Sequence, residues 1–362
     1  MASPTPTTAS PATVLVVGAH GIIGRAVTEH LTSLPGWNVT TASRRGPVDD
    51  LFNGQPAPTH VSVDLLDGSA AKALGSCGGI SHLVYAAYTE RATMAATTAP
   101  NVAMLRHTLD GLRRAGAPLE HVVLIGGGKS YGEHLGRYKT PAKESDPRVL
   151  GPIFYNEQED LLWDRAAADG FTWTVLRPDG IFGPCTRSPM NMLTSLAAFA
   201  AICRHQGIPL RFPGSPGAWT ALHQTTDAEL LARAVDWALT ADPARGEAFN
   251  VTNGDHFRWQ HLWPDLAEHF SMPIAAPRPM SLTEQMSDKE EVWNSVVARH
   301  GLRATPWQAV ASWPFVDGWL SADFDMVQST IKIRQAGFAA CVDTHESLRR
   351  NLTALRTHRY LP

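Results

Sequence analysis

The sequence predicts an α/β fold, in which a doubly wound parallel sheet is joined by a smaller, mainly helical lobe toward the C-terminus. Three observations predict it. An apolar strand at 14–17 runs into glycines at positions 18, 21 and 24. Strand-like and helix-like segments then alternate as far as Pro178, and beyond Gly183 this alternation breaks down. Strands that alternate with helices at these spacings form a parallel sheet, which binds its ligand at the carboxyl ends of the strands.

The first element is a strand, a glycine turn and a helix that runs to Leu31. Gly18 permits the tight turn, Gly21 lets the backbone approach a pyrophosphate, and Gly24 packs the helix against the strand. The N-terminus of the helix faces the anion. Three glycines also occur in ordinary turns, but these follow a strand and open a helix. We therefore predict a dinucleotide-binding Rossmann unit.

The second strand predicts which dinucleotide is bound. It spans Val39–Ala42 and continues as Ser43, Arg44 and Arg45, where an NAD-specific chain would place an acidic residue for the ribose 2′-hydroxyl. Because a guanidinium can hold a 2′-phosphate bidentately, NADP(H) is favoured over NAD(H), and a solvated basic turn is the alternative. Asp64 follows the alternating run at 60–63 and is expected near the adenine.

The later elements follow the same reasoning. Before Gly183 we predict strands at 82–87, 121–126 and 172–178, a helix at 101–114, and a segment at 152–168 that starts extended and becomes helical. After it we predict a helix at 190–204, a strand at 208–212, a helix at 226–239 that returns to the sheet, and a strand at 248–251. Asn101, at the start of its predicted helix, would either cap it or hold the backbone near the nicotinamide.

These elements divide the chain into two lobes and a tail. Residues 1–12 are rich in Ser, Thr, Pro and Ala, lack the features of a signal peptide, and are expected to be disordered. The dinucleotide-binding domain is expected at 13–185 and also receives 225–255, and a substrate lobe is expected at 186–224 and 256–362. Six tryptophans of that lobe are expected in its core or around an apolar pocket, which favours an apolar substrate. They are Trp259, Trp263, Trp293, Trp307, Trp313 and Trp319.

Composition excludes several classes of function. Lys plus Arg number 31 against 34 Asp plus Glu, a formal net charge of −3, so the chain offers no strong field for nucleic acid or an anionic membrane. No segment approaches the roughly 18 apolar residues of a membrane span. The four cysteines are far apart, which predicts reduced thiols and a cytoplasmic location. The histidines show no ligand pattern, so no metal is expected. The oligomeric state stays open, a homodimer included.

The expected catalytic motif of a short-chain dehydrogenase, Tyr-x-x-x-Lys, is absent. Tyr131 is followed at that spacing by a leucine, Tyr138 by an alanine and Tyr155 by a glutamate. Two other segments carry candidate groups instead. They are Gly-Gly-Gly-Lys-Ser-Tyr-Gly at 126–132, after a predicted strand, and Phe-Tyr-Asn-Glu-Gln-Glu-Asp-Leu-Leu at 154–162, at the start of a predicted helix.

These two segments resemble the progesterone 5β-reductase and iridoid synthase-like enone reductases, which are atypical extended short-chain dehydrogenases. In that family the lysine comes from a Gly-x-Lys-x-Tyr loop and the tyrosine from a Phe-Tyr segment, which correspond here to Lys129 and Tyr155. The resemblance covers nearly the whole chain after the tail. It continues through motifs at 177–183, 188–191, 207–214, 218–219, 247–255 and 259–263.

Two positions depart from the family pattern. Asn156 stands where the family often has a second tyrosine, so only Tyr155 can fill the tyrosine role. Tyr88 stands where a tryptophan is common near the substrate, which leaves the substrate open. Asp179 is expected to stabilise its turn rather than to act as a general acid.

The resemblance implies NADPH-dependent conjugate reduction of a small apolar enone or enal, in which Tyr155 donates to the enolate oxygen and Lys129 adds positive charge. A carbonyl reductase or epimerase-like enzyme is the alternative, and a non-catalytic NADP(H) sensor is a third. Tyr88, Tyr131 and Met192 are expected at the substrate. The residues expected at the cofactor are Gly18, His20, Gly21, Ile22, Ile23, Gly24, Ser43, Arg44, Arg45, Asp64, Leu65, Ala86, Ala87, Tyr88, Asn101, Gly126, Pro178 and Ile181.

Overall fold

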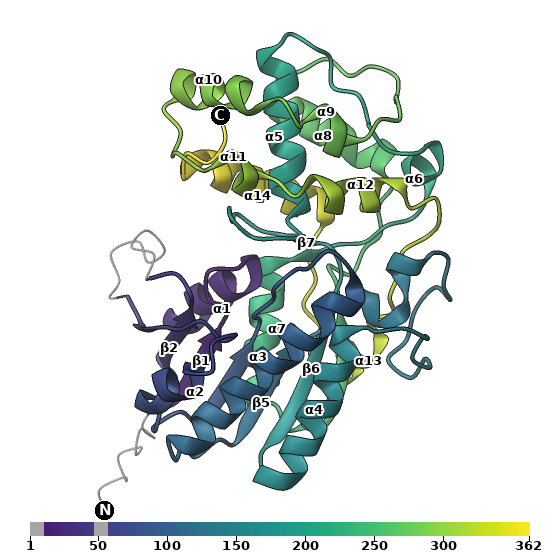
Figure 1. Ribbon diagram of the computed structural model, residues 1–362. Coiled ribbons are helices and arrows are strands. Elements are labelled where there is room, and N and C mark those ends of the chain that lie inside the picture. Colours follow the sequence, from purple (N-terminus) through teal and green to yellow (C-terminus); the bar gives the residue numbers. More distant parts are fainter. Residues whose placement is uncertain (1–10, 47–56) are drawn as a thin grey trace, which may run out of the picture.

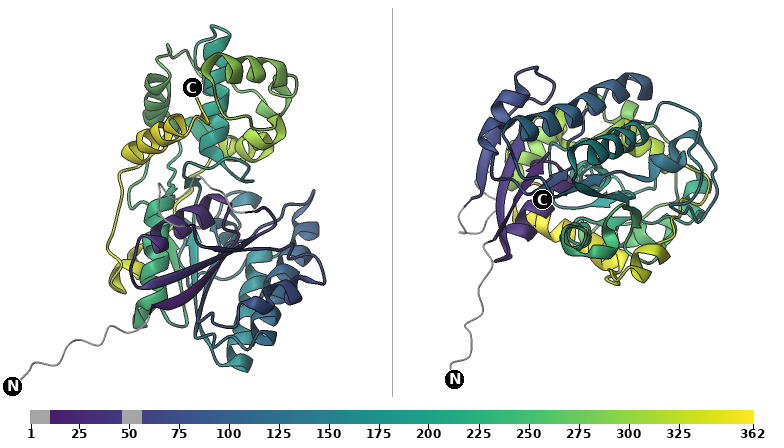
Figure 2. Two further views of the ribbon diagram at one scale, coloured as in Figure 1. Left: turned by 90° about the vertical axis from the view of Figure 1, so that its left-hand side faces the viewer. Right: turned by 90° about the horizontal axis from the view of Figure 1, so that it is seen from below.

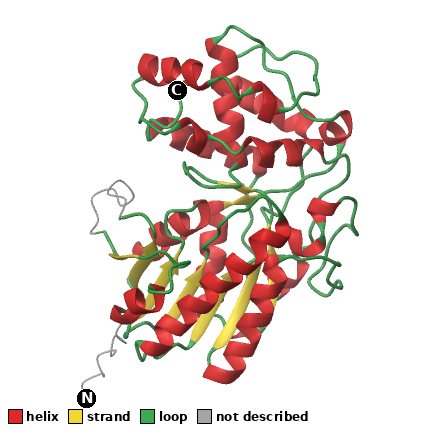
Figure 3. Cartoon of the chain, in the orientation of Figure 1, coloured by secondary structure: helices red, strands yellow, loops and turns green. Residues whose placement is uncertain are grey.

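The computed structural model describes residues 11–46 and 57–362 and contains two lobes, one built on a sheet and the other helical (Figure 1). Most of the tail predicted at 1–12 lies outside the described residues. Figure 3 shows the long strands confined to the sheet lobe, and Figure 2 shows the helical lobe stacked over one end of that sheet. The predicted Rossmann architecture with a helical C-terminal lobe is confirmed.

The sheet has seven parallel strands in the order β3-β2-β1-β4-β5-β6-β9. Chain order reverses between β1 and β4, and in doubly wound sheets a crevice for the ligand opens at such a point. Val17 at the end of β1 lies level with Ala42 of β2 and Tyr85 of β4. The strands are β1 Ala12–Val17, β2 Trp37–Ser43, β3 Thr59–Ser62, β4 His82–Tyr85, β5 His121–Ile125, β6 Thr172–Pro178 and β9 Glu247–Val251.

Helices cover both faces of this sheet, which is why its central strands read as continuous apolar runs. Val14 and Val16 of β1 face the core under α1 and α7, whereas Leu15 and Val17 face the core under α2, α3 and α4. The alternation of side chains along one strand therefore supplies two cores. The helices of this lobe are α1 Ile22–Thr32, α2 Ala70–Ala73, α3 Met94–Arg114, α4 Phe154–Asp169, α7 Ala228–Thr240 and α13 Ile331–Gln335, with 3₁₀ turns η1 Leu74–Ser76, η2 Gly128–Tyr131, η3 Glu133–Leu135 and η4 Asp242–Ala244.

The second lobe is built around α5, whose residues are almost all buried. All six tryptophans expected inside this lobe are buried, and Trp259, Trp263 and Trp293 are core residues. Two short parallel strands, β7 Ile181–Phe182 and β8 Thr226–Asp227, lie between the lobes. The helices are α5 Met192–His205, α6 Pro216–Thr220, α8 Trp259–His269, α9 Leu282–Gln285, α10 Glu290–His300, α11 Trp307–Val310, α12 Trp313–Ser321 and α14 Thr344–Thr357.

Asp227, fully buried, ties these elements together. It caps α7 by accepting from the backbone N–H groups of Glu229 and Leu230 at 2.9 and 3.2 Å. Its other oxygen accepts from Arg350 at 2.6 Å and Asn351 at 3.0 Å, both on α14. One carboxylate therefore joins a sheet-lobe helix to the last helix of the chain.

Two predicted elements differ in the structure. The helix predicted at 101–114 begins at Met94, capped by Thr93, because Pro100 is accommodated inside the helix instead of starting it. The strand predicted at 208–212 is wrong, since only Leu210 forms an isolated bridge, with Ile274. Of this run only Leu210 and Phe212 are buried, in the core of the second lobe, whereas Ile208 is exposed.

Candidate active site

A cavity of about 770 Å³ runs along the carboxyl ends of the strands and under the second lobe. Its floor follows the order of the sheet, because segments just after β3, β2, β1, β4, β5 and β6 all line it. Most of the predicted site residues therefore lie together. They are Gly18, His20, Gly21, Ile22, Ile23, Ser43, Arg44, Arg45, Asp64, Leu65, Ala86, Ala87, Tyr88, Gly126, Lys129, Tyr155, Pro178 and Ile181.

Four predicted site residues do not line this cavity, and each has a physical reason. Gly24 lies behind the glycine turn, where a Cβ would be 2.3 Å from the carbonyl oxygen of Gly18. Met192 is fully buried in the second lobe, beneath Gly180. The other two, Asn101 and Tyr131, use their polar atoms elsewhere, as described below.

The glycine turn is shaped for close approach of a ligand. Gly18 has φ +84°, and a Cβ there would be 2.7 Å from the backbone of Ala86, so only glycine fits. Gly21 is the N-cap of α1 and supplies no side-chain cap. Backbone N–H groups at the start of a helix are a ready anion site. The turn therefore fits the pyrophosphate of a dinucleotide.

The end of β2 forms a basic, hydrogen-bonded turn. Ser43 Oγ donates to the carbonyl oxygen of Arg45 at 2.7 Å, and Arg45 Nη2 donates to the carbonyl oxygen of His20 at 3.1 Å. Burial, reinforced by the charge of Arg45, lowers the pKa of His20 to about 4. Asp64 Oδ1 accepts from the N–H of Leu66 at 3.0 Å, so this carboxylate is already oriented by its own turn.

Asn101 holds the loop that follows β4. It lies fully buried inside α3, so the capping role is wrong. Its amide accepts from the N–H of Thr89 at 3.0 Å and donates to the carbonyl oxygen of the same residue at 2.7 Å. Because Tyr88 and Thr89 line the cavity, the side chain fixes one wall without facing it.

Tyr155 and Lys129 both line the cavity, and they reach it from different elements. Tyr155 is the second residue of α4, and its phenol leans on Gly127, where a Cβ would be 2.9 Å from the hydroxyl oxygen. Lys129 lies in the 3₁₀ turn after β5 with Nζ 3.7 Å from Met190 Sδ. The phenol of Tyr155 hydrogen-bonds to no group in the described parts of the chain.

The surroundings of Tyr155 and Lys129 shift the pKa values of both side chains. Burial raises the pKa of Tyr155, an effect that Tyr88 and Glu133 reinforce, so the phenol remains a donor. Burial lowers the pKa of Lys129, and the carboxylates of Glu133 and Glu90 oppose this. No carboxylate in 11–46 or 57–362 forms an ion pair with Lys129. Its positive charge is therefore directed at the cavity rather than neutralised.

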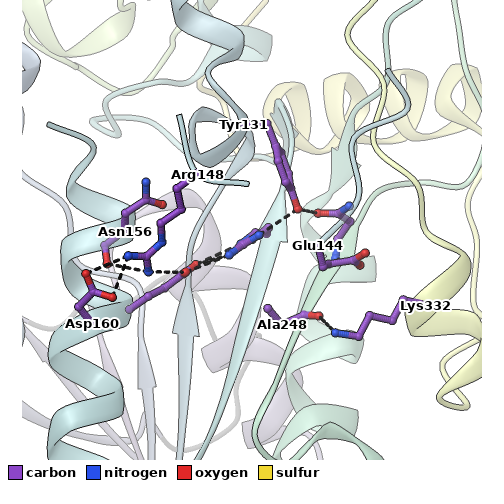
Figure 4. A network of polar contacts seen from close by, with 10 residues as sticks. Tyr131, Glu144, Arg148, Asn156, Asp160, Ala248 and Lys332 are labelled. Atoms are coloured by element: carbon purple, nitrogen blue, oxygen red, sulfur yellow. Dashed lines mark hydrogen bonds and ion pairs between the residues drawn. The ribbon is translucent and has the colours of Figure 1, made fainter. Parts of the chain in front are cut away.

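Tyr131 belongs to a buried polar network behind the loop that follows β5 (Figure 4). Its hydroxyl donates to Asn250 Oδ1 and accepts from Arg177 Nη1 at 3.1 Å. Arg177 in turn binds Glu159 of α4 bidentately at 2.9 Å, and Arg148 lies on the far side of that carboxylate. The network links α4, β6 and β9 below the cavity, so the structure corrects the expectation that Tyr131 contacts substrate.

Comparison with known proteins decides the family. A model described as the PRISE-like Rossmann-fold domain matches residues 15–362. The chain belongs to this family. It is 34% identical to an (S)-8-oxocitronellyl enol synthase of Camptotheca acuminata over 96% of this chain and 93% of that protein. It is 32% identical to a 3-oxo-Delta(4,5)-steroid 5-beta-reductase of Arabidopsis thaliana over 92% of this chain and 89% of that protein.

The PRISE-like chain also shares its fold with more distant solved structures. A UDP-glucose 4-epimerase of Thermus thermophilus, in complex with NAD, has a TM-score of 0.65 at 18% identity and covers 95% of this chain and 99% of its own. An epimerase of Methanothermobacter thermautotrophicus has a TM-score of 0.69 at 15% identity, with 96% and 93% covered. The family and its relatives make the chain an oxidoreductase.

Several residues of this PRISE-like cavity escaped sequence reasoning. The second lobe contributes Pro306, Ala309 and Phe315, which no local pattern marks as cavity residues, and also Trp319, one of the six tryptophans expected in its core or around an apolar pocket. The loop after β7 contributes the segment 187–190. Positions 188–190 fall within one of the motifs that carry the family resemblance, but no local pattern assigns them or Arg187 to the cavity.

Two carboxyl groups of the cavity wall were also missed or given only a structural role. Burial raises the pKa of Glu133 well above its ordinary range, and burial raises that of Asp179 to about 7. Asp179 accepts from the N–H of Gly180 at 2.8 Å, as a turn-stabilising carboxylate does. Among residues 11–46 and 57–362, no group of three or more His, Cys, Asp or Glu is placed to hold a metal, and no helix is long and apolar enough to span a membrane.

Proposed function

We propose that this protein uses NADPH to reduce the C=C bond of small apolar α,β-unsaturated carbonyl compounds by 1,4-hydride addition. The observation that carries the proposal is the phenol of Tyr155, which lines the same cavity as Lys129. Two kinds of relative support it, because one is named as the synthase of an enol and the other as the reductase of a Delta(4,5)-steroid.

The residues present fit NADPH. The glycine turn is too close to the backbone of Ala86 for any side chain at Gly18, and the N-cap residue of α1, Gly21, supplies no side chain, so backbone N–H groups there can face a pyrophosphate. Arg44 and Arg45 supply cations at the end of β2, where a 2′-phosphate would lie. Ala86, Ala87 and Pro178 would flank the nicotinamide half. When bound, NADPH supplies the hydride that the β-carbon accepts.

Tyr155 stabilises the negative charge that this hydride addition creates. Negative charge accumulates on the carbonyl oxygen as an enolate, and the phenol donates a hydrogen bond to it. One oxyanion donor of this kind contributes about 2.7–4 kcal/mol to the transition state. Lys129 stabilises the same charge through the low-dielectric cavity. Since burial keeps Tyr155 protonated, the donor is present across the physiological pH range.

The walls of the cavity select an apolar substrate. Tyr88 and Phe154 approach each other with ring centroids 5.2 Å apart, and the second lobe adds Phe315 and Trp319. Aromatic faces of this kind exclude water and favour flat conjugated molecules. We expect the enone to lie between the pair of rings formed by Tyr88 and Phe154 on one side and the rings of Phe315 and Trp319 on the other. Its carbonyl oxygen would point toward Tyr155.

The decisive experiment locates the transferred hydride. NADPH labelled with deuterium at C4 is incubated with the protein and a cyclic enone, an unsaturated dialdehyde, and a saturated ketone as control. We expect deuterium at the β-carbon and no turnover of the ketone. Deuterium at the former carbonyl carbon would make the protein a carbonyl reductase, and NADPH binding without turnover of any compound would make it a sensor.

The cysteines bear on where such a reaction takes place. All four are free thiols, and Cys77, Cys185 and Cys203 are buried. Reduced cysteines fit a reducing compartment, and we propose a cytoplasmic location on that ground. Fractionation of the producing cells tests this, since the activity is expected with the cytoplasmic fraction.

A further inference from the structure

The loop between β7 and α5 forms one wall of the cavity, and its backbone is strained. Arg187 and Met190 have φ angles of +58° and +55°, a region that residues other than glycine rarely occupy. Both residues line the cavity. Strain of this kind persists only where surrounding contacts impose it, and it is concentrated at binding sites.

Contacts on three sides impose the strain. The N–H of Arg187 donates to the carbonyl oxygen of Ala309, in the second lobe, at 3.0 Å. Ser188 Oγ accepts from the N–H of Ile22, at the start of α1, at 3.4 Å. Cys185 Sγ lies 3.6 Å from the carbonyl oxygen of His20. The loop is thus held between the glycine turn and the second lobe, and Arg187, which is largely exposed, stands at the edge of the cavity that it lines.

Within the described part of the chain, Arg187 has no counter-charge there. No carboxylate among residues 11–46 and 57–362 pairs with it, and the group whose titration it influences is another guanidinium, that of Arg45. The pKa of Arg45 is lowered by burial, and the charge of Arg187 lowers it further. Two like charges that converge on one cavity repel each other unless an anion lies between them. Arg45 itself stands at the basic end of β2.

We propose that Arg187 is a phosphate ligand, and that with Arg45 it clamps a phosphate group of the dinucleotide from the side opposite the sheet. The proximity of Arg45 favours the 2′-phosphate of NADPH, and the pyrophosphate is the other source of the same chemistry. The inference rests on the proposed function for the identity of the cofactor. Under this proposal, the preference for NADPH depends on Arg187 as well as on the arginines at the end of β2. Arg187 lies in a loop that is hydrogen-bonded to the second lobe.

Binding titrations test this without any turnover. NADPH, NADH, 2′,5′-ADP and 5′-ADP are titrated calorimetrically against the full chain and against Arg187→Met, which removes the charge but keeps a long side chain and the same backbone strain. Arg137→Met serves as the matched control, because Arg137 is an exposed loop arginine paired with Asp323 and outside the cavity. Circular dichroism and thermal unfolding of each variant establish that it is folded.

A charge-assisted hydrogen bond contributes about 1.5–3 kcal/mol, so Arg187→Met should raise the Kd of its ligand by about tenfold or more. An increase for NADPH and 2′,5′-ADP alone identifies the 2′-phosphate. An increase for NADPH, NADH and 5′-ADP that is absent or smaller for 2′,5′-ADP, which carries single phosphates and no diphosphate, identifies the diphosphate. Arg187→Lys should recover part of the affinity, since it restores the charge without the bidentate geometry. Unchanged Kd values for all four ligands would overturn the inference.

The outcomes separate this inference from the proposed function. If Arg187→Met loses affinity for NADPH while the unaltered protein reduces no enone, the phosphate clamp stands and the proposed reaction fails. If enones are reduced normally and Arg187→Met binds every nucleotide like the unaltered protein, the reaction stands and the clamp fails. Higher salt should weaken NADPH binding less in Arg187→Met than in the unaltered protein, because one charge contact is missing.

Discussion

At the scale of single residues, the absence of a side chain at Gly127 makes room for the phenol of Tyr155, the proposed oxyanion donor. Gly127 follows β5, and its Cα surface supports the ring of Tyr155. A methyl group there would lie 2.9 Å from the hydroxyl oxygen, which is closer than real Cβ atoms approach. The sequence shows three consecutive glycines at 126–128 but does not say which of them the site requires. Gly127 is the one of the three that lies against Tyr155, whereas a Cβ at Gly128 would lie 2.1 Å from Glu133 Oε2.

We therefore expect Gly127→Ala to displace the hydroxyl of Tyr155 and to lower kcat by about a hundredfold, since a misplacement near 1 Å has that effect on positioned groups. Stability should change little, because the ring can move into the cavity. Steady-state kinetics with a cyclic enone measures the loss. Gly79→Ala is the control, because Gly79 is exposed, distant from the cavity and free of neighbours around its Cα. Equal kcat values for both variants would contradict the positioning role.

Removing the hydroxyl itself gives the second prediction. Tyr155→Phe keeps the ring between Phe154 and Gly127 but deletes the donor, so kcat for a weakly activated enone should fall by about 10²–10³-fold. The Kd of NADPH should stay the same. An unsaturated dialdehyde, whose enolate needs less stabilisation, should be affected less. Turnover equal to that of the unaltered protein on both substrates would show that Tyr155 only packs.

At the scale of elements, the sequence predicted the sheet well and the boundaries of some helices poorly. The central strands of the sheet were recognisable as continuous apolar runs, because helices cover both of their faces. The start of α3 was missed because Pro100 usually opens a helix, whereas here Thr93 caps one that already contains the proline. For the same reason Asn101 was placed at a helix start, and its actual partner, the backbone of Thr89, is twelve residues away.

The third prediction concerns the cap that joins two helices. Asp227→Ala removes the cap of α7 and the buried charged acceptor that Arg350 and Asn351 of α14 share, so we expect a loss of roughly 2.5–4 kcal/mol in the free energy of unfolding, from one cap and the hydrogen bonds to a charged group. Asp343→Ala is the matched control. Asp343 is an exposed cap of α14 with one backbone partner, and its loss should cost about 1 kcal/mol.

Urea unfolding, followed by circular dichroism, measures both variants. The larger loss for Asp227→Ala distinguishes a joint between lobes from an ordinary helix cap. If the two variants lost equal stability, the contacts with α14 would contribute nothing and the two helices would be held by apolar packing alone.

At the scale of the whole molecule, the second lobe contains a buried histidine that makes stability depend on pH. His223 is fully buried among Phe257, Trp259 and Trp319. Its Nε2 donates to the carbonyl oxygen of Ala218 at 3.1 Å, and its Nδ1 is buried without a partner in the described residues. Burial lowers the pKa of His223 from 6.5 to about 4, because a second proton on the ring would find no acceptor.

The sign of the pH effect follows from this shift. Below pH 6.5 His223 becomes protonated in the unfolded chain but stays neutral in the folded protein. The free energy of unfolding should therefore fall as the pH drops from 6.5 to 4. For this residue the fall is at most about 1.4 kcal/mol per pH unit. His223→Gln should be less stable at pH 7 and lose less on acidification. Thermal unfolding from pH 7 to 4 tests this, with the exposed His261→Gln as control. Identical slopes for the unaltered protein and His223→Gln would contradict it.

The candidate site could be predicted from sequence only where it is local. Residues that follow strand ends, such as Gly18, Arg45 and Lys129, are placed by the sheet and were found from pattern and resemblance. The upper wall is formed by Phe315 and Trp319, whose position depends on how the second lobe packs over the sheet. No spacing in the chain encodes that packing, and so the substrate side of the site was the part that sequence alone left undefined.

The path of the chain between the lobes limits how such a protein can be recombined. After β7 it enters the second lobe through α5, returns to build β8, α7 and β9, and then leaves again for α8. A chimera of two related proteins made with a single crossover would therefore contain one lobe that comes from both parents. The contacts between Asp227 and α14 would then join residues of different parents. Selectivity for a new substrate is more accessible through substitutions in the cavity wall than through exchange of the whole upper lobe.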